Sequence, residues 1–465
     1  MLDLNPVIED LSTVTGGYRE ILISSMNLIA DRYERDLGYP WIDTKFNTIT
    51  GEDFLKEDPL RSKGIVYSWI QGRGLESLMI HIEWILNNYT DSKTILLTKR
   101  LNRIVKEVAE SVKTAVKLNG GHLSFFMNPL GKTLVQGIDG KMEEHVLTQK
   151  NPWNISDIFG SKGLFAASLI SGNEIDRISS VEYIKKIVNG ITHGNFITDQ
   201  QPLAEKNPVT AVKGRLSHTP WMLIIGSLTL LLKHGVSEAL SPGIRAIQYI
   251  LDNHINIAGK WENLEENDYV EYIKTNGELW VSEGCVLSDP GHALEFVGLT
   301  SRFLSTALSL KTLENETKQV LSEISPYLFP IFQRNFTNGF NRKAEGITKL
   351  IDLISRQPVN RLMPWWSLPE TMRAALGCYE IIQREEEREF CLEAYSLCHN
   401  SLMNNYIQTE SSGLFSVQNR DENGRIIDSI SAVPDADPGY HTGIALIDCL
   451  DMIESNTHRG TDTNE

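Results

Sequence analysis

The sequence predicts an all-α fold, a toroid of antiparallel helical hairpins with a few short β-hairpins at one end. Amphipathic helical periodicity recurs along almost the whole 465-residue chain, whereas strand patterns are few. No Pro/Ser-rich linker divides the chain, so we expect one domain over residues 1–455 and a polar tail at 456–465. A helical solenoid is the alternative, but it would show a sequence repeat, and we find none.

Each helix is predicted from an apolar stripe. The clearest stripe begins at Leu101 and Val105 and continues to Val116, and the Asn-Gly-Gly at 119–121 provides a C-terminal stop. Similar stretches cover residues 14–35, 72–88, 181–192, 219–234, 242–253, 292–308, 313–335, 345–356, 369–383, 387–407 and 439–455. Short polar connectors separate them, as expected for helical hairpins.

Three segments predict β-hairpins instead. Residues 125–134 contain a Pro-Leu-Gly turn and residues 413–430 a Glu-Asn-Gly turn, each between apolar or alternating stretches. Residues 272–287 follow the same pattern and lead directly into an Asp-Pro-Gly-His sequence.

Composition excludes several classes of protein. The net charge of -16 and the lack of a clustered Lys/Arg patch argue against nucleic-acid binding. The five cysteines are scattered without metal-ligand spacing, which indicates reduced thiols in the cytosol. The N-terminus shows no signal-peptide pattern, and the longest apolar run, 221–232, is shorter than the ~20 residues that span a bilayer. We expect a cytoplasmic protein with no membrane partner.

Two Asp-Pro-Gly sequences, at 289–291 and 437–439, each precede a histidine. Asp is a good N-cap and Pro suits the first helical position, so both read as helix starts. His292 then lies in a first turn with Glu295 on the same face, and His441 lies in the other first turn. The positive end of a helix helps to keep an imidazole neutral, so the pair could act in proton transfer from two rigid helix ends. The alternative is that both are cap-region residues.

The stretch YSWIQGRGLESL (67–78) places Arg73 near Trp69 and Gln71. A buried arginine can stabilise an oxyanion or hold a hydroxylated ligand. The alternative is a surface arginine at a helix start.

The stretch RLMPWWSLPETM (361–372) joins Trp365 and Trp366 to Glu370. Aromatic faces beside a carboxylate suit a sugar, because rings pack on CH groups and acids bind hydroxyls. Core tryptophans and a glutamate at a helix start are the alternative.

Taken together and in order, WIQGR, PGHALE, WWSLPE and GYH resemble the motifs of the N-acylglucosamine 2-epimerase family, which includes cellobiose 2-epimerases and aldose–ketose isomerases. The resemblance spans roughly residues 18–452 and implies an (α/α)6 toroid with a central site. It also implies cofactor-independent chemistry at C1 and C2 of a sugar such as N-acetylglucosamine/N-acetylmannosamine or mannose/glucose/fructose, and a homodimer.

The implied mechanism is 1,2-proton transfer through an enediol(ate) on the open-chain sugar. His292 and His441 would be the acid/base pair, with Glu295 orienting His292 and Arg73 stabilising the oxyanion. The substrate-binding residues would be Trp69, Gln71, Trp365, Trp366 and Glu370. No metal is expected, because no His/Asp/Glu set has ligand spacing in the sequence. A glycoside hydrolase using Glu295 and Glu370, or a non-catalytic carbohydrate-binding protein, are the alternatives.

Overall fold

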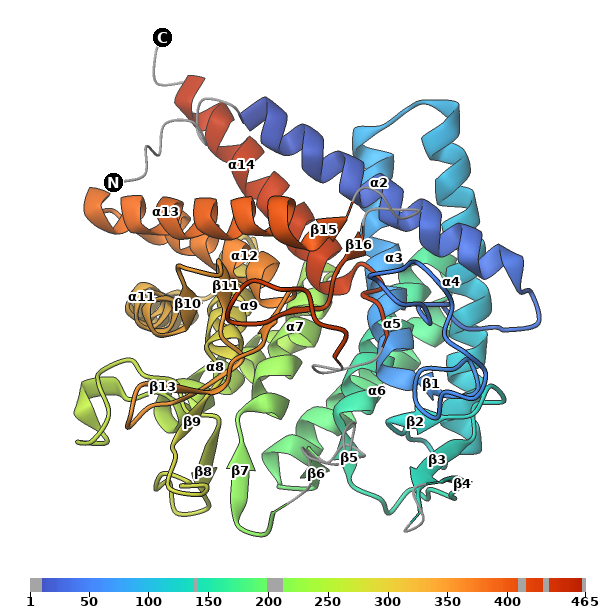
Figure 1. Cartoon of the computed structure of the whole chain (residues 1–465), viewed down its shortest axis with the longest axis horizontal. Coiled ribbons are helices and arrows are strands. Elements are labelled where there is room, and N and C mark those ends of the chain that lie inside the picture. Colours follow the sequence, from blue (N-terminus) through green and yellow to red (C-terminus); the bar gives the residue numbers. More distant parts are fainter. Residues whose placement is uncertain (1–10, 138–140, 199–211, 409–414, 430–434, 462–465) are drawn as a thin grey trace.

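The structure is a computed structural model that describes residues 11–137, 141–198, 212–408, 415–429 and 435–461. It confirms the all-α toroid (Figure 1). Within the described residues, the inner helices contact one another in ring order, and the last contacts the first through the π-helical segment η5 (Tyr440–Ile444). The inner helices are α3 (Ser68–Asn88), α5 (Ile155–Ser171), α7 (Thr219–Lys233), α9 (Pro290–Leu308), α12 (Ser367–Ile381) and α14 (Ala445–Thr461).

An outer layer covers this ring, and each outer helix is joined to inner neighbours along the chain. Its helices are α2 (Leu11–Arg35), α4 (Ser92–Leu118), α6 (Glu174–Thr192), α8 (Leu240–His254), the pair α10 (Asn315–Ile324) and α11 (Leu328–Gly339), and α13 (Glu385–Ser401). In Figure 1, α4 lies on one side of the molecule and α11 and α13 on the other. The core lies mainly between the layers, where most large apolar side chains are buried.

Three helix predictions need correction. The sequence analysis missed α5, which is apolar almost all round because neighbours cover it on every side. The predicted helix at 313–335 is interrupted by the 3₁₀ turn Ser325–Tyr327. The predicted helix at 345–356 is wrong: its apolar residues belong to β11 (Gly346–Ile347) and β12 (Leu350–Asp352).

The strands are short and form small separate sheets. The hairpin expected at 125–134 is confirmed as β2 (Phe126–Met127) and β3 (Thr133–Gln136), in a four-stranded sheet with β1 (Val66–Tyr67) and β4 (Met142–Glu144). A parallel pair joins β5 (Trp153–Asn154) to β6 (Phe196–Ile197), and β10 (Phe340–Asn341) pairs with β11.

The other two predicted hairpins each keep one antiparallel bridge of their own, Ile273 with Leu279 and Arg420 with Ile426, but their strands pair with other segments. Within 272–287, β8 (Tyr272–Lys274) pairs with β7 (Arg215–Ser217), and β9 (Leu287–Ser288) pairs with β12, which also pairs with β13 (Gln357–Asn360). Within 413–430, β16 (Phe415–Ser416) pairs with β15 (Ile407–Gln408), and β17 (Asn419–Arg420) with β14 (Met363–Pro364). Residues 413, 414 and 430 lie outside the described residues. Long-range pairing therefore ties the loops at this end of the toroid together.

Helix α14 continues through Thr461, well into the segment expected to be a polar tail, and residues 462–465 lie outside the described part. None of the described helices has both the length and the hydropathy needed to cross a bilayer. All five cysteines are free.

Candidate active site

The first Asp-Pro-Gly sequence starts a helix as predicted. The Asp289 side chain accepts a hydrogen bond from Gly291 N at 2.9 Å, and Pro290 occupies the first position of α9. A Cβ at position 291 would lie 2.9 Å from Cη2 of Trp366, so glycine allows the start of α9 to approach this indole. The arrangement fixes His292 beside Trp366.

Glu271, rather than Glu295, orients His292. The imidazole Nδ1 lies 3.1 and 3.2 Å from the two carboxylate oxygens of Glu271, which comes from the loop before β8. The prediction for Glu295 rested on its helical spacing, but the imidazole points to the loop. Because a carboxylate can only accept, Nδ1 carries the proton and Nε2 is left for a ligand.

The charges around His292 favour its imidazolium form. Burial alone would lower the pKa of His292, but Asp289, at 3.5 Å, and Glu271 raise it above its ordinary value. Burial raises the pKa of Glu271, but His218, His292 and Lys349 lower it to about 2 overall. This contradicts the expectation that the helix N-terminus keeps His292 neutral, because two buried carboxylates outweigh the helix dipole.

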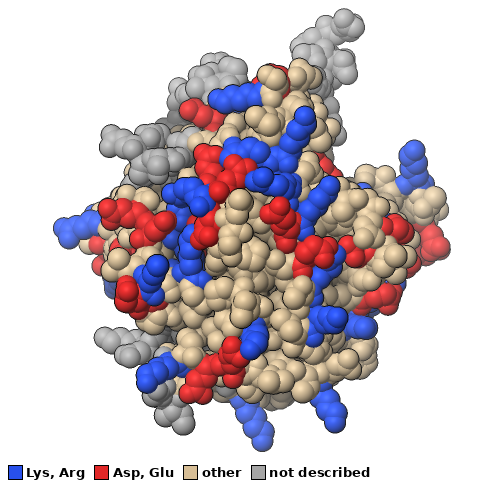
Figure 2. Space-filling model, turned by 90° about the vertical axis from the view of Figure 1, so that its right-hand side faces the viewer, with Lys and Arg blue, Asp and Glu red and all other residues tan. Residues whose placement is uncertain are grey.

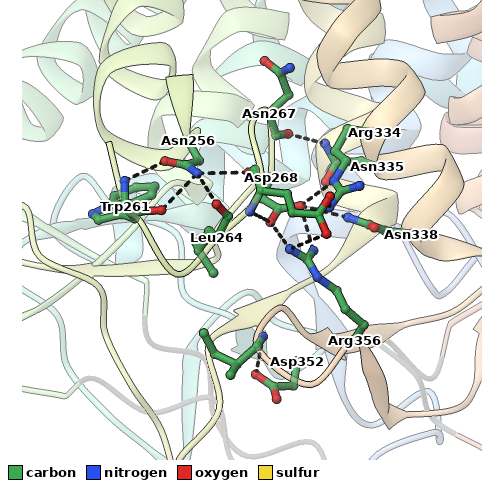
Figure 3. Close-up of polar contacts among 12 residues, drawn as sticks. Asn256, Trp261, Leu264, Asn267, Asp268, Arg334, Asn335, Asn338, Asp352 and Arg356 are labelled. Carbon is green, nitrogen blue, oxygen red and sulfur yellow. Dashed lines mark hydrogen bonds and ion pairs between the residues drawn. The ribbon is translucent and has the colours of Figure 1, made fainter. Parts of the chain in front are cut away.

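A buried ion cluster fixes the loop that carries Glu271 (Figure 3). Asp268 is fully buried and accepts hydrogen bonds from Arg334 Nε at 2.8 Å and from Arg356 Nη1 and Nη2 at 2.9 and 2.6 Å. Asn338 Nδ2 adds a contact of 3.1 Å. These partners come from α11 and from the β12–β13 connection, so the cluster joins three segments just before Glu271.

Two further histidines lie behind His292, and the sequence analysis missed both. The rings of His218 and His292 are 5.2 Å apart, and those of His218 and His254 are 5.8 Å apart. Burial lowers the pKa of His218, and burial together with His218 lowers that of His254 to about 3. Both are therefore neutral near pH 7 and do not offset the negative charges of Glu271 and Asp289.

The second Asp-Pro-Gly sequence has a different geometry. Asp437 Oδ1 accepts from Tyr440 N at 2.8 Å and Oδ2 from Thr442 N at 2.9 Å, but the residues that follow form a π-helical turn rather than an α-helix. Gly439 has φ of 80°, and a Cβ there would lie 2.8 Å from Ser77 Oγ. Glycine therefore brings the turn that carries His441 against α3.

Glu370 orients His441 in the way that Glu271 orients His292. His441 Nδ1 lies 2.8 Å from Glu370 Oε1, and the other carboxylate oxygen of Glu370 is hydrogen-bonded to Arg373. Arg373 also lies 3.5 Å from Asp448, which pairs with Arg302 at 2.7 Å. Glu370 was expected to bind sugar, but its buried carboxylate is occupied by these two partners.

Burial and the positive charge of Arg73 lower the pKa of His441 to about 3. Its neutral ring donates from Nδ1 to Glu370, so Nε2 keeps its lone pair and can accept a proton. Burial raises the pKa of Glu370, against the opposing effect of Arg373. Glu295 is buried nearby, and burial followed by Glu370 raises its pKa.

Trp366 lies between the two catalytic candidates. Its ring centroid is 5.5 Å from that of His292, with nearly parallel planes, and 5.5 Å from that of His441. Trp365 is buried and its Nε1 is 3.3 Å from Thr442 Oγ1, which holds the turn before α14. Trp69 is also buried, with no hydrogen-bond partner for Nε1 among the described residues.

Arg73 lies over a set of aromatic rings. Its guanidinium is 4.3 Å from the ring of Phe159, 4.9 Å from that of Tyr440 and 5.1 Å from that of Trp69. Within the described part of the chain it makes no ion pair, and its Nε is buried without a hydrogen-bond partner. A cation in this state can stabilise a negative charge that develops on a ligand.

Gln71 does not share this role. Its Oε1 accepts from Ile42 N at 2.7 Å and its Nε2 donates to Ile42 O at 3.2 Å, so both ends of the amide are used by the backbone. These bonds fix the segment before α3, and the role of Gln71 in binding substrate stays a prediction.

The sequence matches no family model and no curated protein. Among solved structures, it is similar to a sugar epimerase from a ruminal bacterium, with 13% identity, a TM-score of 0.62, and coverage of 94% of this chain and 98% of the other. It is also similar to cellobiose 2-epimerase from Spirochaeta thermophila DSM 6192, with 12% identity, a TM-score of 0.64, and coverage of 98% of this chain and 100% of the other. A third similar structure is a D-mannose isomerase, with 12% identity, a TM-score of 0.54, and coverage of 91% of this chain and 97% of the other.

The chain has the fold of these epimerases and isomerase. The (α/α)6 architecture implied by the motifs is therefore confirmed, and the neighbours are consistent with the family that the motifs resemble.

The structure also adds a buried ion pair that sequence reasoning missed. Lys162 Nζ on α5 lies 2.5 Å from Glu76 Oε1 on α3 and 3.5 Å from the hydroxyl of Tyr440. Because Tyr440 contacts Arg73, this pair supports the same corner of the site. Its spacing in the sequence gives no signal, since the partners belong to different inner helices.

Two groups of potential metal ligands also come together. One is His218, Glu271 and His292, and the other is Glu295, Glu370 and His441. The sequence-based expectation that no such set exists overlooked these groups, because their members are far apart in the chain. In each group a histidine already donates to a carboxylate, so the residues form hydrogen-bonded acid/base pairs as they stand.

Proposed function

We propose that the protein is a sugar 2-epimerase or an aldose–ketose isomerase that works by cofactor-independent 1,2-proton transfer on the open-chain sugar. The observation that carries the proposal is the pair of carboxylate-oriented histidines whose pKa values are shifted in opposite directions. His441 is neutral near pH 7 and can act as base, whereas the raised pKa of His292 favours its imidazolium form relative to an ordinary histidine and suits it to act as acid.

The reaction begins with removal of the proton at C2, next to the open-chain aldehyde. His441 Nε2 takes this proton, and the resulting enediolate carries negative charge on the former carbonyl oxygen. Arg73, which has no carboxylate partner among the described residues, stabilises that charge. Return of a proton from His292 to the opposite face of C2 gives the epimer. Return of the proton from His441 to C1, with transfer of the O2 hydroxyl proton to O1, gives the ketose.

The indole of Trp366, in contact with both histidines, provides a surface for the CH groups of the sugar. Trp69 and Trp365 are also buried, and their contacts make them supports: Trp69 packs against Arg73, and Trp365 bonds to Thr442 in the turn that carries His441. The names of the three structural neighbours, two epimerases and an isomerase, support a sugar as substrate.

Hydrolysis of a glycoside is less well supported. It requires two carboxyl groups on opposite sides of the scissile bond. Glu295 and Glu370 have oxygens within 4.8 Å of each other, close to the ~5–5.5 Å of retaining glycosidases, but both are buried and lie against a His441 nitrogen. Glu370 is moreover engaged by Arg373 and His441.

The test is proton NMR in deuterated water with separate incubations of mannose, glucose, fructose, N-acetylglucosamine, N-acetylmannosamine and cellobiose. We expect exchange of the C2 proton in at least one sugar, together with a new epimer or ketose. His441→Gln should abolish exchange, because the base is lost. A folded protein that exchanges no proton on any of these sugars would contradict the proposal.

Two controls separate the alternatives. Release of a smaller sugar from cellobiose, without rearrangement at its reducing end, would establish a hydrolase. Treatment with EDTA followed by assay tests the two ligand-capable groups, and we expect the rate to stay unchanged.

A further inference from the structure

A second cavity lies in the outer wall of the toroid, away from the two histidines of the candidate active site. It has a volume of about 740 Å³ and is bordered by α4, α5 and α6. The floor is apolar or small and consists of Ala109, Val116, Leu164, Ala167 and Ser168. A cavity of this size with a few converging polar groups is typical of a small-molecule site.

The cavity contains a histidine held in one orientation. His122 is buried, and its Nδ1 lies 3.2 Å from Oδ2 of the fully buried Asp157. Asp157 is itself fixed, since it accepts from Leu123 N at 2.7 Å and from the Tyr183 hydroxyl at 2.6 Å. Because the carboxylate accepts the Nδ1 proton, Nε2 is the free edge of an imidazole that borders the cavity, and no described residue bonds to it.

Aromatic and cationic groups stand beside this imidazole. The ring of Trp153 lies 4.4 Å from that of His122 and 5.7 Å from that of Tyr183. Lys186 lies one helical turn after Tyr183 and lines the cavity. It makes no ion pair with any described carboxylate. Lys113, by contrast, is neutralised by Glu110 at 2.5 Å and Asp176 at 2.9 Å.

We propose that this cavity binds a small organic anion with a ring or comparable apolar body. Lys186 would bind the carboxylate or phosphate group, His122 Nε2 would accept a hydrogen bond from a donor on the body of the ligand, and the body would lie on Trp153 and the apolar floor. Figure 2 shows that Lys and Arg alternate with Asp and Glu on the α4 side of the molecule, so selectivity for an anion comes from these local groups rather than from a broad positive surface.

The experiment is calorimetric titration of the full chain with four probes at low salt. Benzoate and phenyl phosphate carry both an anion and a ring, inorganic phosphate lacks the ring, and benzyl alcohol lacks the charge. We expect benzoate or phenyl phosphate to bind, and the stronger of the two identifies the anionic group. Inorganic phosphate and benzyl alcohol should bind at least about tenfold more weakly.

A matched pair of lysine variants locates the site. Lys186→Ala should weaken binding about tenfold, because one charge-assisted hydrogen bond is lost. Lys185→Ala, which removes the adjacent lysine paired with Glu182, should leave binding unchanged. Both lysines are exposed, so neither change disturbs the core. Arg73→Met should also leave binding unchanged, which excludes the candidate active site as the place of binding.

Three results would overturn the proposal. One is no heat of binding with either ring-bearing anion up to about 10 mM, which corresponds to a negligible affinity. Another is equal binding of benzyl alcohol and benzoate, which would leave an apolar cavity without anion preference. The third is equal affinity of the Lys186→Ala and Lys185→Ala variants.

Discussion

Replacing Glu271 by Gln should lower the pKa of His292. The carboxylate lies 3.1 Å from Nδ1, and two unit charges at that separation interact by about 5 kcal/mol at an effective dielectric constant of about 20. The amide oxygen of Gln still accepts from Nδ1, and Asp289 remains at 3.5 Å, so only part of this energy is lost. Exchanging a charge-assisted for a neutral hydrogen bond costs about 1–1.5 kcal/mol of imidazolium stabilisation, which lowers the pKa of His292.

The assay is the titration of the imidazole signals by proton–nitrogen NMR, which requires no substrate. A His292→Asn variant assigns the signal, and Glu278→Gln, a change to an exposed carboxylate in the next turn of the chain, is the control that should not move it. If the proposed sugar chemistry holds, the alkaline limb of kcat/KM should shift down in pH with the pKa, because His292 loses its proton earlier. An unchanged or raised pKa in Glu271→Gln would refute the assignment of Glu271 as the orienting carboxylate.

Three stability changes can be tested by chemical denaturation. Gly443→Ala should destabilise the fold by at least about 2 kcal/mol, since its Cβ would lie 2.4 Å from Cε1 of His81, whereas Gly16→Ala has open space and should be neutral or stabilising. Burial lowers the pKa of His81 to about 4, so the unfolded chain binds this proton first as pH falls, and about 3 kcal/mol of stability should be lost between about pH 6.5 and 4 through His81 alone. Other buried histidines such as His254 add to the slope, so His81→Gln should make it shallower by about that amount. Asp268→Asn should cost about 3–5 kcal/mol by leaving buried arginines unpaired, whereas Glu265→Gln, 64% exposed beside the same arginines, should cost less than about 1 kcal/mol. Equal effects of Asp268→Asn and Glu265→Gln would contradict the role of the buried cluster.

The local signals in the sequence predicted the start of α9 correctly. Asp289 and Pro290 act within three residues, so N-cap chemistry alone places His292 in the first turn. Helix α5 was missed for the opposite reason. Its neighbours bury it on all sides, and the polar stripe that marks an amphipathic helix is absent even though its Asn154 capping box is present.

The partners of the two histidines could not be predicted from spacing. Glu295 was predicted to orient His292 because residues three apart share a helical face. The residue that does so, Glu271, lies in a loop 21 positions earlier in the chain. The same limit applies to the pairing of His441 with Glu370, 71 positions apart. Such contacts depend on how the helices pack to close the toroid. Residue spacing in a single sequence does not predict which distant residues this packing brings together.

The two Asp-Pro-Gly-linked histidines show how similar motifs can acquire pKa values shifted in opposite directions. At His292, loops bring two carboxylates to one imidazole, and their charges outweigh the effect of burial on its pKa. At His441, the charge of the orienting Glu370 is shared with Arg373, and Arg73 adds a positive charge nearby. Inversion at one carbon atom requires an acid and a base on its opposite faces, and here the difference in pKa is produced by the loops and inner helices around the histidines.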